Sequence, residues 1–167
     1  MGKEARTIDL TLSKRADYAV RAAIALGRAW PERRTIRAVA MATGVSEAFT
    51  PHVLRSLVRA GMVDARAGRS GGYALAVAPE QVRILDIVEA AEGPLTTTRC
   101  TLRGGACYWE NVCPMHRTWS DAIIALRSVL HSATLSEVIA RDIDLELGVL
   151  EIPADSHRLS RSAGPLP

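Results

Sequence analysis

A glycine between two short helical patterns is the feature that most limits the folds open to this chain. In TIRAVAMATG, residues 35–44, apolar side chains fall on one face of a short helix, and Gly44 ends it. In VSEAFTPHVLRSLVRAG, residues 45–61, the inward positions are again apolar, and Gly61 ends the second pattern. Two short helices joined at a glycine predict a helix-turn-helix.

The second of these helices has a polar side that can face a ligand. Its residues are Ser46, Thr50, His52, Arg55 and Arg59. A helix-turn-helix places such side chains in the major groove of DNA, and we expect Thr50, His52 and Arg55 to reach base edges. Pro51 would interrupt the helix if it began at Ser46, whereas a helix capped by Thr50 would hold Pro51 at its first position. The sequence leaves both starts open.

The next segment alternates between apolar and polar residues on either side of a glycine-rich turn. In MVDARAGRSGGYALAVAP, residues 62–79, the two arms predict a β-hairpin with AGRSGG between them. Arg66 and Arg69 lie near its tip, so we expect them to contact phosphates or the minor groove, like the wing of a winged helix. GRSGG fits neither a dinucleotide fingerprint nor a Walker sequence, which argues against a nucleotide site.

Four further helical patterns indicate a fold that is mainly α with a small β-hairpin wing. They cover residues 12–30, 82–93, 116–130 and 134–143. Ser13 is expected to cap the first, and Thr134 with Glu137 forms a capping box at the last. The third is long and amphipathic, so it needs a partner surface.

One segment, TRCTLRGGACYWENVCPMHR, contains all three cysteines of the chain, Cys100, Cys107 and Cys113. It also contains His116, three residues after the last cysteine. The alternative that these are small buried hydrophobes fits poorly, because the flanking Thr, Arg, Gly, Glu and Asn form no core pattern. Thiolates so closely spaced are soft ligands, typical of a loop that wraps a metal centre.

Charge is distributed unevenly along the chain. Residues 1–75 carry 13 Lys+Arg against 6 Asp+Glu, or +7, and the remainder carries 8 against 12, or −4. A basic first half indicates a polyanionic partner for that half, although a solvated basic face is the simpler alternative.

Neither a membrane span nor a signal peptide is expected. No window reaches the roughly 18 unbroken apolar residues of a span, and MGKEARTIDL lacks an apolar stretch. We therefore expect a cytoplasmic protein, in which clustered cysteines are better explained by metal or redox chemistry than by a disulfide. The histidines, cysteines and carboxylates form no convincing catalytic arrangement, so we do not expect an enzyme.

The order of these features resembles the Rrf-type family of bacterial repressors, which includes IscR-like and NsrR-like iron–sulfur members. The resemblance covers residues 10–143 and rests on LSKRADYAVRA, the helix-turn-helix, a wing ending in GGY, the three cysteines, CPMHRTWSDA and TLSEVIA. It implies a homodimer in which the long helix crosses its mate and each wing contacts DNA.

The resemblance also assigns cluster ligands. Cys100, Cys107 and Cys113 match the cluster cysteines of the family, although the first gap is one residue longer than in IscR-like members. His116 stands where IscR-like members use histidine beside a 2Fe-2S cluster, and Asp17 stands where NsrR-like members use aspartate beside a 4Fe-4S cluster. Both remain candidates for the fourth ligand, because three thiolates with one weaker ligand suit either form.

The leading hypothesis is a DNA-binding transcriptional repressor whose iron–sulfur cluster senses iron–sulfur status, redox stress or nitric oxide. The alternative is a structural zinc site, because three cysteines and His116 can close a tetrahedral Cys3His set. We expect four segments: an N-terminal extension (1–11), a winged helix-turn-helix domain (12–80), a region with connecting helix, cysteine loop and dimerisation helix (81–143), and a disordered tail (144–167).

Overall fold

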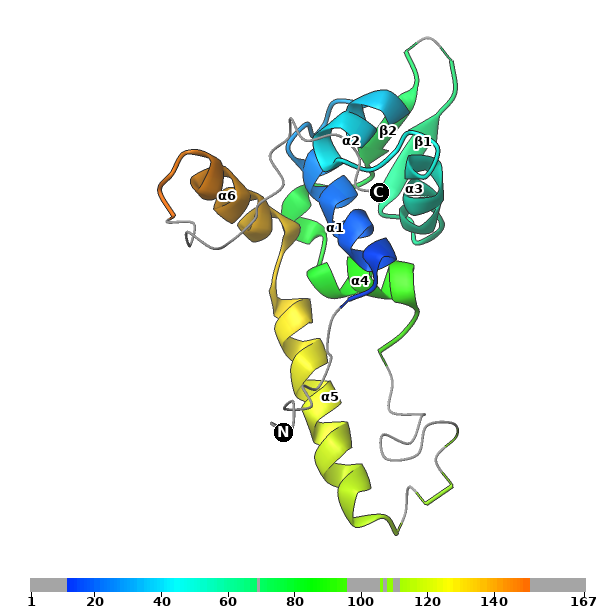
Figure 1. The fold of residues 1–167 in the computed structure, drawn as a ribbon, viewed down its shortest axis with the longest axis vertical. Coiled ribbons are helices and arrows are strands. Elements are labelled where there is room, and N and C mark those ends of the chain that lie inside the picture. Colours follow the sequence, from blue (N-terminus) through cyan, green and yellow to red (C-terminus); the bar gives the residue numbers. More distant parts are fainter. Residues whose placement is uncertain (1–11, 69, 96–105, 107, 110–111, 151–167) are drawn as a thin grey trace, which may run out of the picture.

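The computed structural model of the chain describes residues 12–68, 70–95, 106, 108–109 and 112–150 (Figure 1). The elements in this part of the chain are α1 (Lys14–Gly27), α2 (Ile36–Thr43), α3 (Thr50–Arg59), β1 (Val63–Arg66), β2 (Gly72–Leu75), the 3-10 helix η1 (Pro79–Gln81), α4 (Ile84–Glu92), α5 (Pro114–Ser132) and α6 (Leu135–Glu146). The expected fold class, mainly α with a β-hairpin wing and a long C-terminal helix, is confirmed. None of these helices is long and apolar enough to cross a membrane.

α1 is the central helix of a compact head formed by α1 to α4 and the hairpin (Figure 1). Its buried residues are mostly alanines, namely Ala16, Ala19, Ala22 and Ala23, with Leu26. Small side chains let neighbouring helices approach closely, so α1 contacts α2, α3, α4 and α6. Ser13 caps the helix as predicted, because its Oγ accepts the N–H of Arg15 at 3.2 Å.

The helix-turn-helix consists of α2 and α3. Gly44 ends α2 with φ +71°, the left-handed conformation that glycine adopts without strain. α3 begins at Thr50 and not at Ser46, so Pro51 falls in its first turn, where a missing N–H breaks no helical bond. The start at Ser46 is therefore wrong, and the alternative is nearly right: the cap position is held by Phe49, one residue before the expected Thr50.

The hairpin is antiparallel, with Val63 opposite Leu75 and Arg66 opposite Gly72. The backbones of Arg34 and Tyr73 exchange two hydrogen bonds, of 2.8 and 2.9 Å, which tie β2 to the segment before α2. The hairpin therefore projects from the head as a wing.

α4 belongs to the same core as the helix-turn-helix. Ile87 and Val88 are fully buried and pack with α1 and α3 residues such as Ala19 and Leu54. The boundary expected at residues 80/81 therefore falls inside the packed head rather than at its edge.

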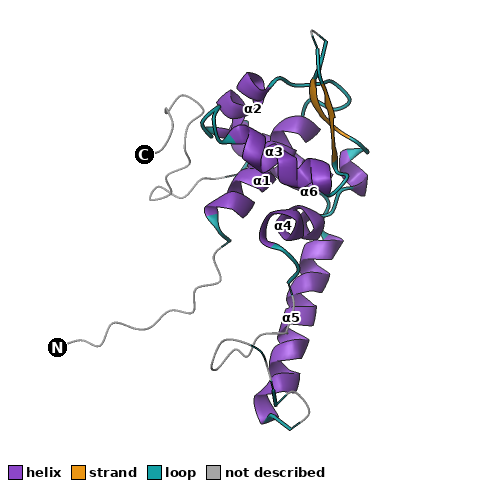
Figure 2. Ribbon diagram, turned by 90° about the vertical axis from the view of Figure 1, so that its right-hand side faces the viewer, coloured by secondary structure: helices purple, strands orange, loops and turns teal. Residues whose placement is uncertain are grey.

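α5 extends away from the head and is joined to it at its C-terminal end (Figure 2). There the chain pairs with the segment before α4: the N–H of Ile84 donates to the carbonyl of Ala133 at 3.0 Å, and that of Leu135 to Val82 at 2.9 Å. The predicted capping box then starts α6, with Thr134 and Glu137 bonded reciprocally.

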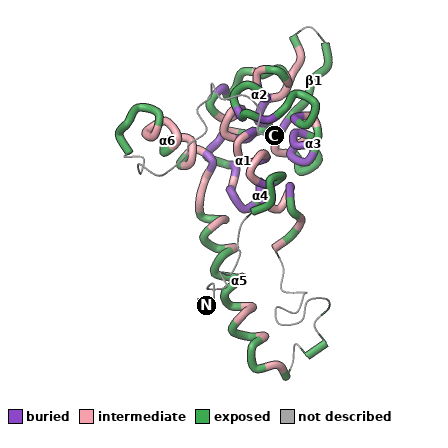
Figure 3. The backbone as a smooth tube through the Cα atoms, in the orientation of Figure 1, coloured by how far each residue is buried: buried purple, intermediate pink, exposed green. Residues whose placement is uncertain are grey.

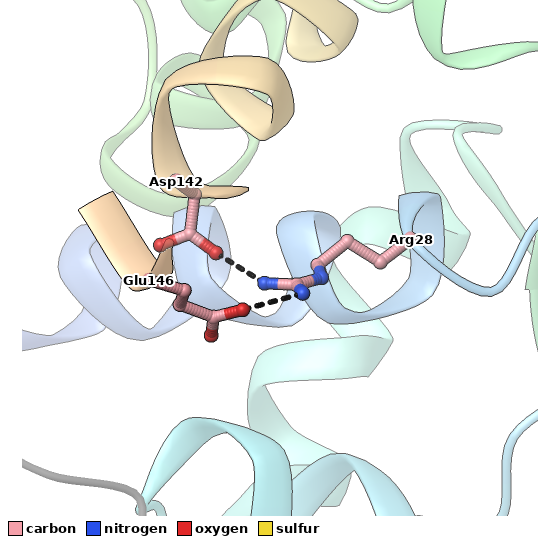
Figure 4. A network of polar contacts seen from close by, with 3 residues as sticks. All are labelled: Arg28, Asp142 and Glu146. Carbon is pink, nitrogen blue, oxygen red and sulfur yellow. Dashed lines mark hydrogen bonds and ion pairs between the residues drawn. The ribbon is translucent and has the colours of Figure 1, made fainter. Parts of the chain in front are cut away.

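α6 folds back onto α1. The Arg28 guanidinium donates to Asp142 at 2.8 Å and to Glu146 at 2.7 Å (Figure 4), and the bond to Glu146 raises the pKa of Arg28. Gly27 allows this approach, since a Cβ there would lie 2.5 Å from Ile139 Cδ1.

The expected tail from residue 144 begins too early, because α6 continues to Glu146. A helix bonded to Arg28 at its last turn is stabilised beyond the point where the apolar periodicity ends. The expected extension 1–11 and the tail from residue 151 onward lie outside the described residues.

Candidate nucleic-acid interface and metal centre

α3 has one side built into the head and the other open to solvent. The buried side holds Val53, Leu54 and Leu57, each at most 2% exposed. His52, Arg55 and Arg59, which the sequence predicts as DNA contacts, are all exposed. Residues three or four positions apart on a helix share a face, so these three side chains form one polar strip.

Thr50, predicted to reach a base edge, lies in the core. It is 1% exposed, and its Oγ1 donates to the carbonyl of Ser46 at 2.9 Å. The backbone N–H groups of Phe49 and Thr50 donate to the same carbonyl, each at 3.0 Å. Thr50 thus closes the turn that starts α3, and we leave it out of the DNA contacts, whereas Ser46 is exposed and stays among them.

Arg33 fastens the wing to the head. Its Nη1 donates to the carbonyls of Gly72 at 3.0 Å and Asp64 at 3.3 Å, and its Nη2 pairs with the Asp64 carboxylate. This hydrogen bond from the guanidinium holds the pKa of Asp64 below its ordinary value, although the carboxylate is half exposed. One side chain therefore links both strands to the segment before α2.

Two adjacent glycines shape the tip of the wing. A Cβ on Gly71 would clash with the backbone of Arg66 and Ala67, and Gly72 has φ +134° with Arg34 packed against it. Arg66 is exposed at the end of β1, where the sequence predicts it. The predicted contact Arg69 lies outside the described residues.

The sequence reasoning misses two exposed residues beside this surface. Arg37 on α2 is 78% exposed at its side chain and lies 3.9 Å from Glu47. Phe49, directly before α3, is 39% exposed and touches the rings of Tyr18 and His52. The available signal was a lone aromatic residue next to the polar face of the second helix.

Cys113 and His116 lie together at the N-terminal end of α5. Cys113 precedes the first helical residue and is half-buried, and its carbonyl accepts the N–H of His116 at 3.1 Å. The Trp109 carbonyl accepts the Cys113 N–H at 2.7 Å, and His116 Nε2 lies 3.3 Å from Ser120 Oγ. The structure thus places one predicted thiolate ligand within one helical turn of the predicted imidazole ligand.

The two other cysteines of the predicted set, Cys100 and Cys107, lie outside the described residues. Within the described ranges, no three His, Cys, Asp or Glu side chains gather in a metal-binding group. The donors that the structure does show, a half-buried thiol and a neighbouring imidazole, are of the kinds that iron and zinc accept.

Asp17, the other predicted fourth ligand, lies in the first turn of α1 and pairs with Arg21 at 2.9 Å. α5 has 19 residues, so it spans about 28 Å, and its C-terminal end is the one joined to the head. Asp17 belongs to α1, which lies in the head beyond the C-terminal end of α5 (Figure 1), whereas Cys113 directly precedes the N-terminal end of α5. The structure brings His116 to Cys113 and does not bring Asp17 there.

The segment that leads to the cysteines is anchored to both α4 and α5. Arg127 on α5 pairs with Glu89 on α4 and donates to the Leu95 carbonyl at 2.9 Å. Glu89 also accepts the N–H of Leu95 at 2.9 Å. Glu92, one turn further, accepts the N–H of Ser13 at 3.0 Å, so α4 joins the start of α1 to this anchor.

Comparison with known proteins agrees with this arrangement. The Rrf2 family, described as "Iron-dependent Transcriptional regulator", matches residues 12–141, which is most of the chain. This chain belongs to the Rrf2 family. Rrf2 proteins are transcriptional regulators and not enzymes, and this chain is accordingly a helix-turn-helix regulator that binds DNA.

Individual Rrf2 relatives cover most of the chain at modest identity. A putative rrf2-like regulator of Rhodobacter capsulatus is 29% identical over 138 residues, which are 77% of this chain and 92% of the relative. The regulator NsrR of Geobacillus kaustophilus is 28% identical over 132 residues, 78% of this chain and 90% of the relative.

Solved structures show the same Rrf2 fold. CymR, the global cysteine regulator of B. subtilis, superimposes with a TM-score of 0.66 at 24% identity, covering 80% of this chain and 98% of CymR. IscR of T. potens gives 0.63 at 23% identity, covering 86% and 93%. These likenesses bear on the fold alone.

Proposed function

We propose that this Rrf2 regulator is a homodimeric repressor whose DNA binding depends on an iron–sulfur cluster. Its signal is iron–sulfur status, redox stress or nitric oxide, and it acts in the cytoplasm, where a bacterial regulator meets its operator. The observation that carries the proposal is the position of Cys113 and His116 at the free end of a helix whose other end is joined to the DNA-binding head.

The proposed ligands are the thiolates of Cys100, Cys107 and Cys113, with one weaker fourth ligand. His116 is available from the same chain, one turn from Cys113. Asp17 is available only from the partner subunit, because α5 separates it from Cys113 within a protomer. When bound, the cluster supplies oxidation-sensitive chemistry, and these residues set its attachment and its access to solvent.

A stripe of apolar residues on α5 supports the homodimer. Met115, Ala122, Leu126 and Val129, the α5 stripe, are spaced at helical intervals and are all exposed. Three other apolar residues of α5 are less exposed: Leu130 packs against the head, and Trp119 and Ile123 are half-buried. A second α5 laid along the stripe would bury these side chains.

For DNA, we propose that α3 lies in the major groove and the wing beside it. His52, Arg55 and Arg59 are exposed on the groove side of α3, with Ser46 just before it. Arg66, and Arg69 beyond it, would meet phosphates or the minor groove. The proposed operator is double-stranded and read by two heads.

A structural zinc site with the same Cys3His donors is the second possibility, favoured by the closeness of Cys113 and His116. Iron and sulfide analysis with visible absorption on anaerobically purified protein separates the two. We expect the protein to be brown and to contain iron and sulfide, and we expect Cys107→Ala to lose the colour, the iron and the sulfide. Colourless protein containing zinc would favour the structural site.

The fourth ligand is identified by comparing His116→Ala with Asp17→Ala in the same assay. Only the true ligand should alter the visible spectrum. Mixed dimers then separate the two routes. A chain carrying both Cys113→Ala and Asp17→Ala, paired with an unmodified chain, leaves one site complete if His116 is the ligand and none if Asp17 acts across the dimer. Both variants should be checked for dimer formation first.

Sensing itself requires different DNA affinities with and without the cluster. We expect holo protein to bind its operator more tightly than apo protein, by about 5- to 150-fold, the usual range of such coupling. Anaerobic titration of both forms onto one operator at one salt concentration measures it. Superimposable curves would leave the cluster a structural role only.

A further inference from the structure

Phe49 is a large apolar side chain exposed on the surface proposed to meet DNA. It is the single phenylalanine of the chain, 39% of it is exposed, and it immediately precedes α3. This is the N-cap position, where Ser, Thr, Asp or Asn normally accepts a backbone N–H, and here no side chain does so. The local needs of the helix therefore do not explain a phenylalanine at this site.

The Phe49 ring is held in place by its neighbours. The Tyr18 ring on α1 packs against it edge-on, with centroids 5.9 Å apart and planes at 75°. The centroid of the His52 ring lies 5.8 Å from that of Phe49, with the two planes at 38°. Backbone bonds fix the turn, because the Phe49 N–H donates to Ser46 at 3.0 Å and its carbonyl accepts from His52 at 2.9 Å. The exposed part of the ring is thus presented in a defined direction.

The surroundings indicate what this ring can recognise. Ser46, Ala48 and His52 beside it are exposed, so the ring lies among residues that precede or begin the recognition helix. In helix-turn-helix proteins the first residues of that helix contact base edges. The major groove offers one apolar group to such a ring, the 5-methyl of thymine.

We propose that Phe49 reads the 5-methyl group of a thymine in each half-site, with Tyr18 holding the ring in position. The inference rests on the proposed placement of α3 in the major groove. Packing on Tyr18 accounts for the buried part of the ring, and contact with thymine accounts for the part that remains exposed. His52 then lies beside the ring, where it meets an adjacent base.

The test removes only the methyl group. A duplex selected by the holo protein from a random-sequence library serves as the operator, and each thymine is replaced in turn by deoxyuridine. We expect one symmetry-related pair of thymines at which deoxyuridine weakens binding by about fourfold per half-site, the effect of one buried methyl group. Affinity for unrelated DNA should not change.

A double-mutant cycle assigns the effect to the ring. Phe49→Ala should weaken binding to the thymine duplex and abolish the difference between thymine and deoxyuridine at that pair, whereas Phe49→Leu should keep part of it. Arg55→Ala is the matched control, and should weaken binding to both duplexes equally. Circular dichroism confirms that each variant is folded.

Each outcome bears on one of the two proposals. If no thymine is sensitive to deoxyuridine, or if Phe49→Ala retains the full sensitivity, the inference about Phe49 is wrong. The first of these results needs no variant, so it holds even if Phe49→Ala fails to fold. If Arg55→Ala still weakens binding, the placement of α3 survives that failure, and if Arg55→Ala has no effect, the placement itself fails.

Discussion

The head and α5 solve the problem of apolar surface in opposite ways. In the head, side chains from α1, α3 and α4 are fully buried against one another, whereas none of the 19 residues of α5 is buried (Figure 3). The head therefore contains its own stabilising core, whereas α5 leaves apolar side chains exposed among the described residues, and we propose that a second chain covers them. Stability should be controlled by the first region and subunit assembly by the second.

The largest effect is expected from the core of the head. Leu57 is completely buried, so Leu57→Ala should lower the free energy of unfolding by about 2–5 kcal/mol through lost burial and a cavity. Urea denaturation measures this change. Val77, which is 40% exposed, is the control, and Val77→Ala should stay within about 0.5 kcal/mol. A similar loss for both variants would mean that the head does not depend on this core.

A charge placed in the α5 stripe should weaken subunit assembly. Leu126→Glu places a carboxylate in the α5 stripe, and we expect the dimer dissociation constant to rise about 30-fold, or about 2 kcal/mol. Ile124→Glu is the matched control, because Ile124 is 61% exposed and two residues turn a helix by about 200°, to its opposite side. Sedimentation equilibrium measures both.

The head of each variant should remain folded. Equal weakening by the two glutamates would contradict the assignment of the stripe, and an unchanged dimer in both would place the interface away from α5.

The junction between the two regions should give a smaller effect. Thr134 caps α6 where the chain returns to the head, so Thr134→Ala should cost about 1 kcal/mol. Hydrogen exchange of the α6 amides detects this loss locally, with α4 amides as the internal reference. Ser132→Ala, two residues earlier, removes a hydroxyl that bonds to the Val129 carbonyl and not to α6, so it should leave exchange of the α6 amides unchanged.

The smallest effect is expected for the pH dependence of the ion pair between Arg33 and Asp64, which holds the wing. Since Arg33 lowers the pKa of Asp64, the folded carboxyl holds its charge to lower pH than the unfolded one. The stabilisation of the folded state by this ion pair is therefore fully present above the ordinary aspartate pKa of 3.8. It is lost as pH falls through the lower pKa of the folded state. NMR titration of the Tyr73 amide should show this step, and Asp64→Asn should remove it. A step above 3.8 would contradict the pairing.

Local signals in the sequence predict the elements well. Gly44, Ser13 and the Thr134–Glu137 pair each determine a helix end through bonds made within a few residues, so a single sequence carries them. The hairpin is equally local, because its two strands adjoin one turn.

What the sequence does not predict depends on contacts between distant residues. Thr50 is a polar residue that the sequence assigns to the open face of the helix. Because α3 begins at Thr50, its side chain instead points into the core. Arg33 looks like a surface charge after a helix, and its role appears only when the wing lies beside it. The same holds for the division between Asp17 and His116, which depends on the direction in which α5 leaves the head.

The two hydrogen bonds from the Arg28 guanidinium to Asp142 and Glu146 also affect how the molecule orients in an electric field, because they fix the position of the acidic helix α6. α6 carries one cation, Arg141, and four carboxylates, Glu137, Asp142, Asp144 and Glu146. The ion pairs with Arg28 hold this helix on the side of α1 away from α3 (Figure 1). The head and α6 together therefore form an electric dipole, negative at α6 and positive toward the wing. Approaching a phosphate backbone, such a dipole turns its basic face forward before contact, which raises the rate of productive encounter and makes that rate fall with ionic strength.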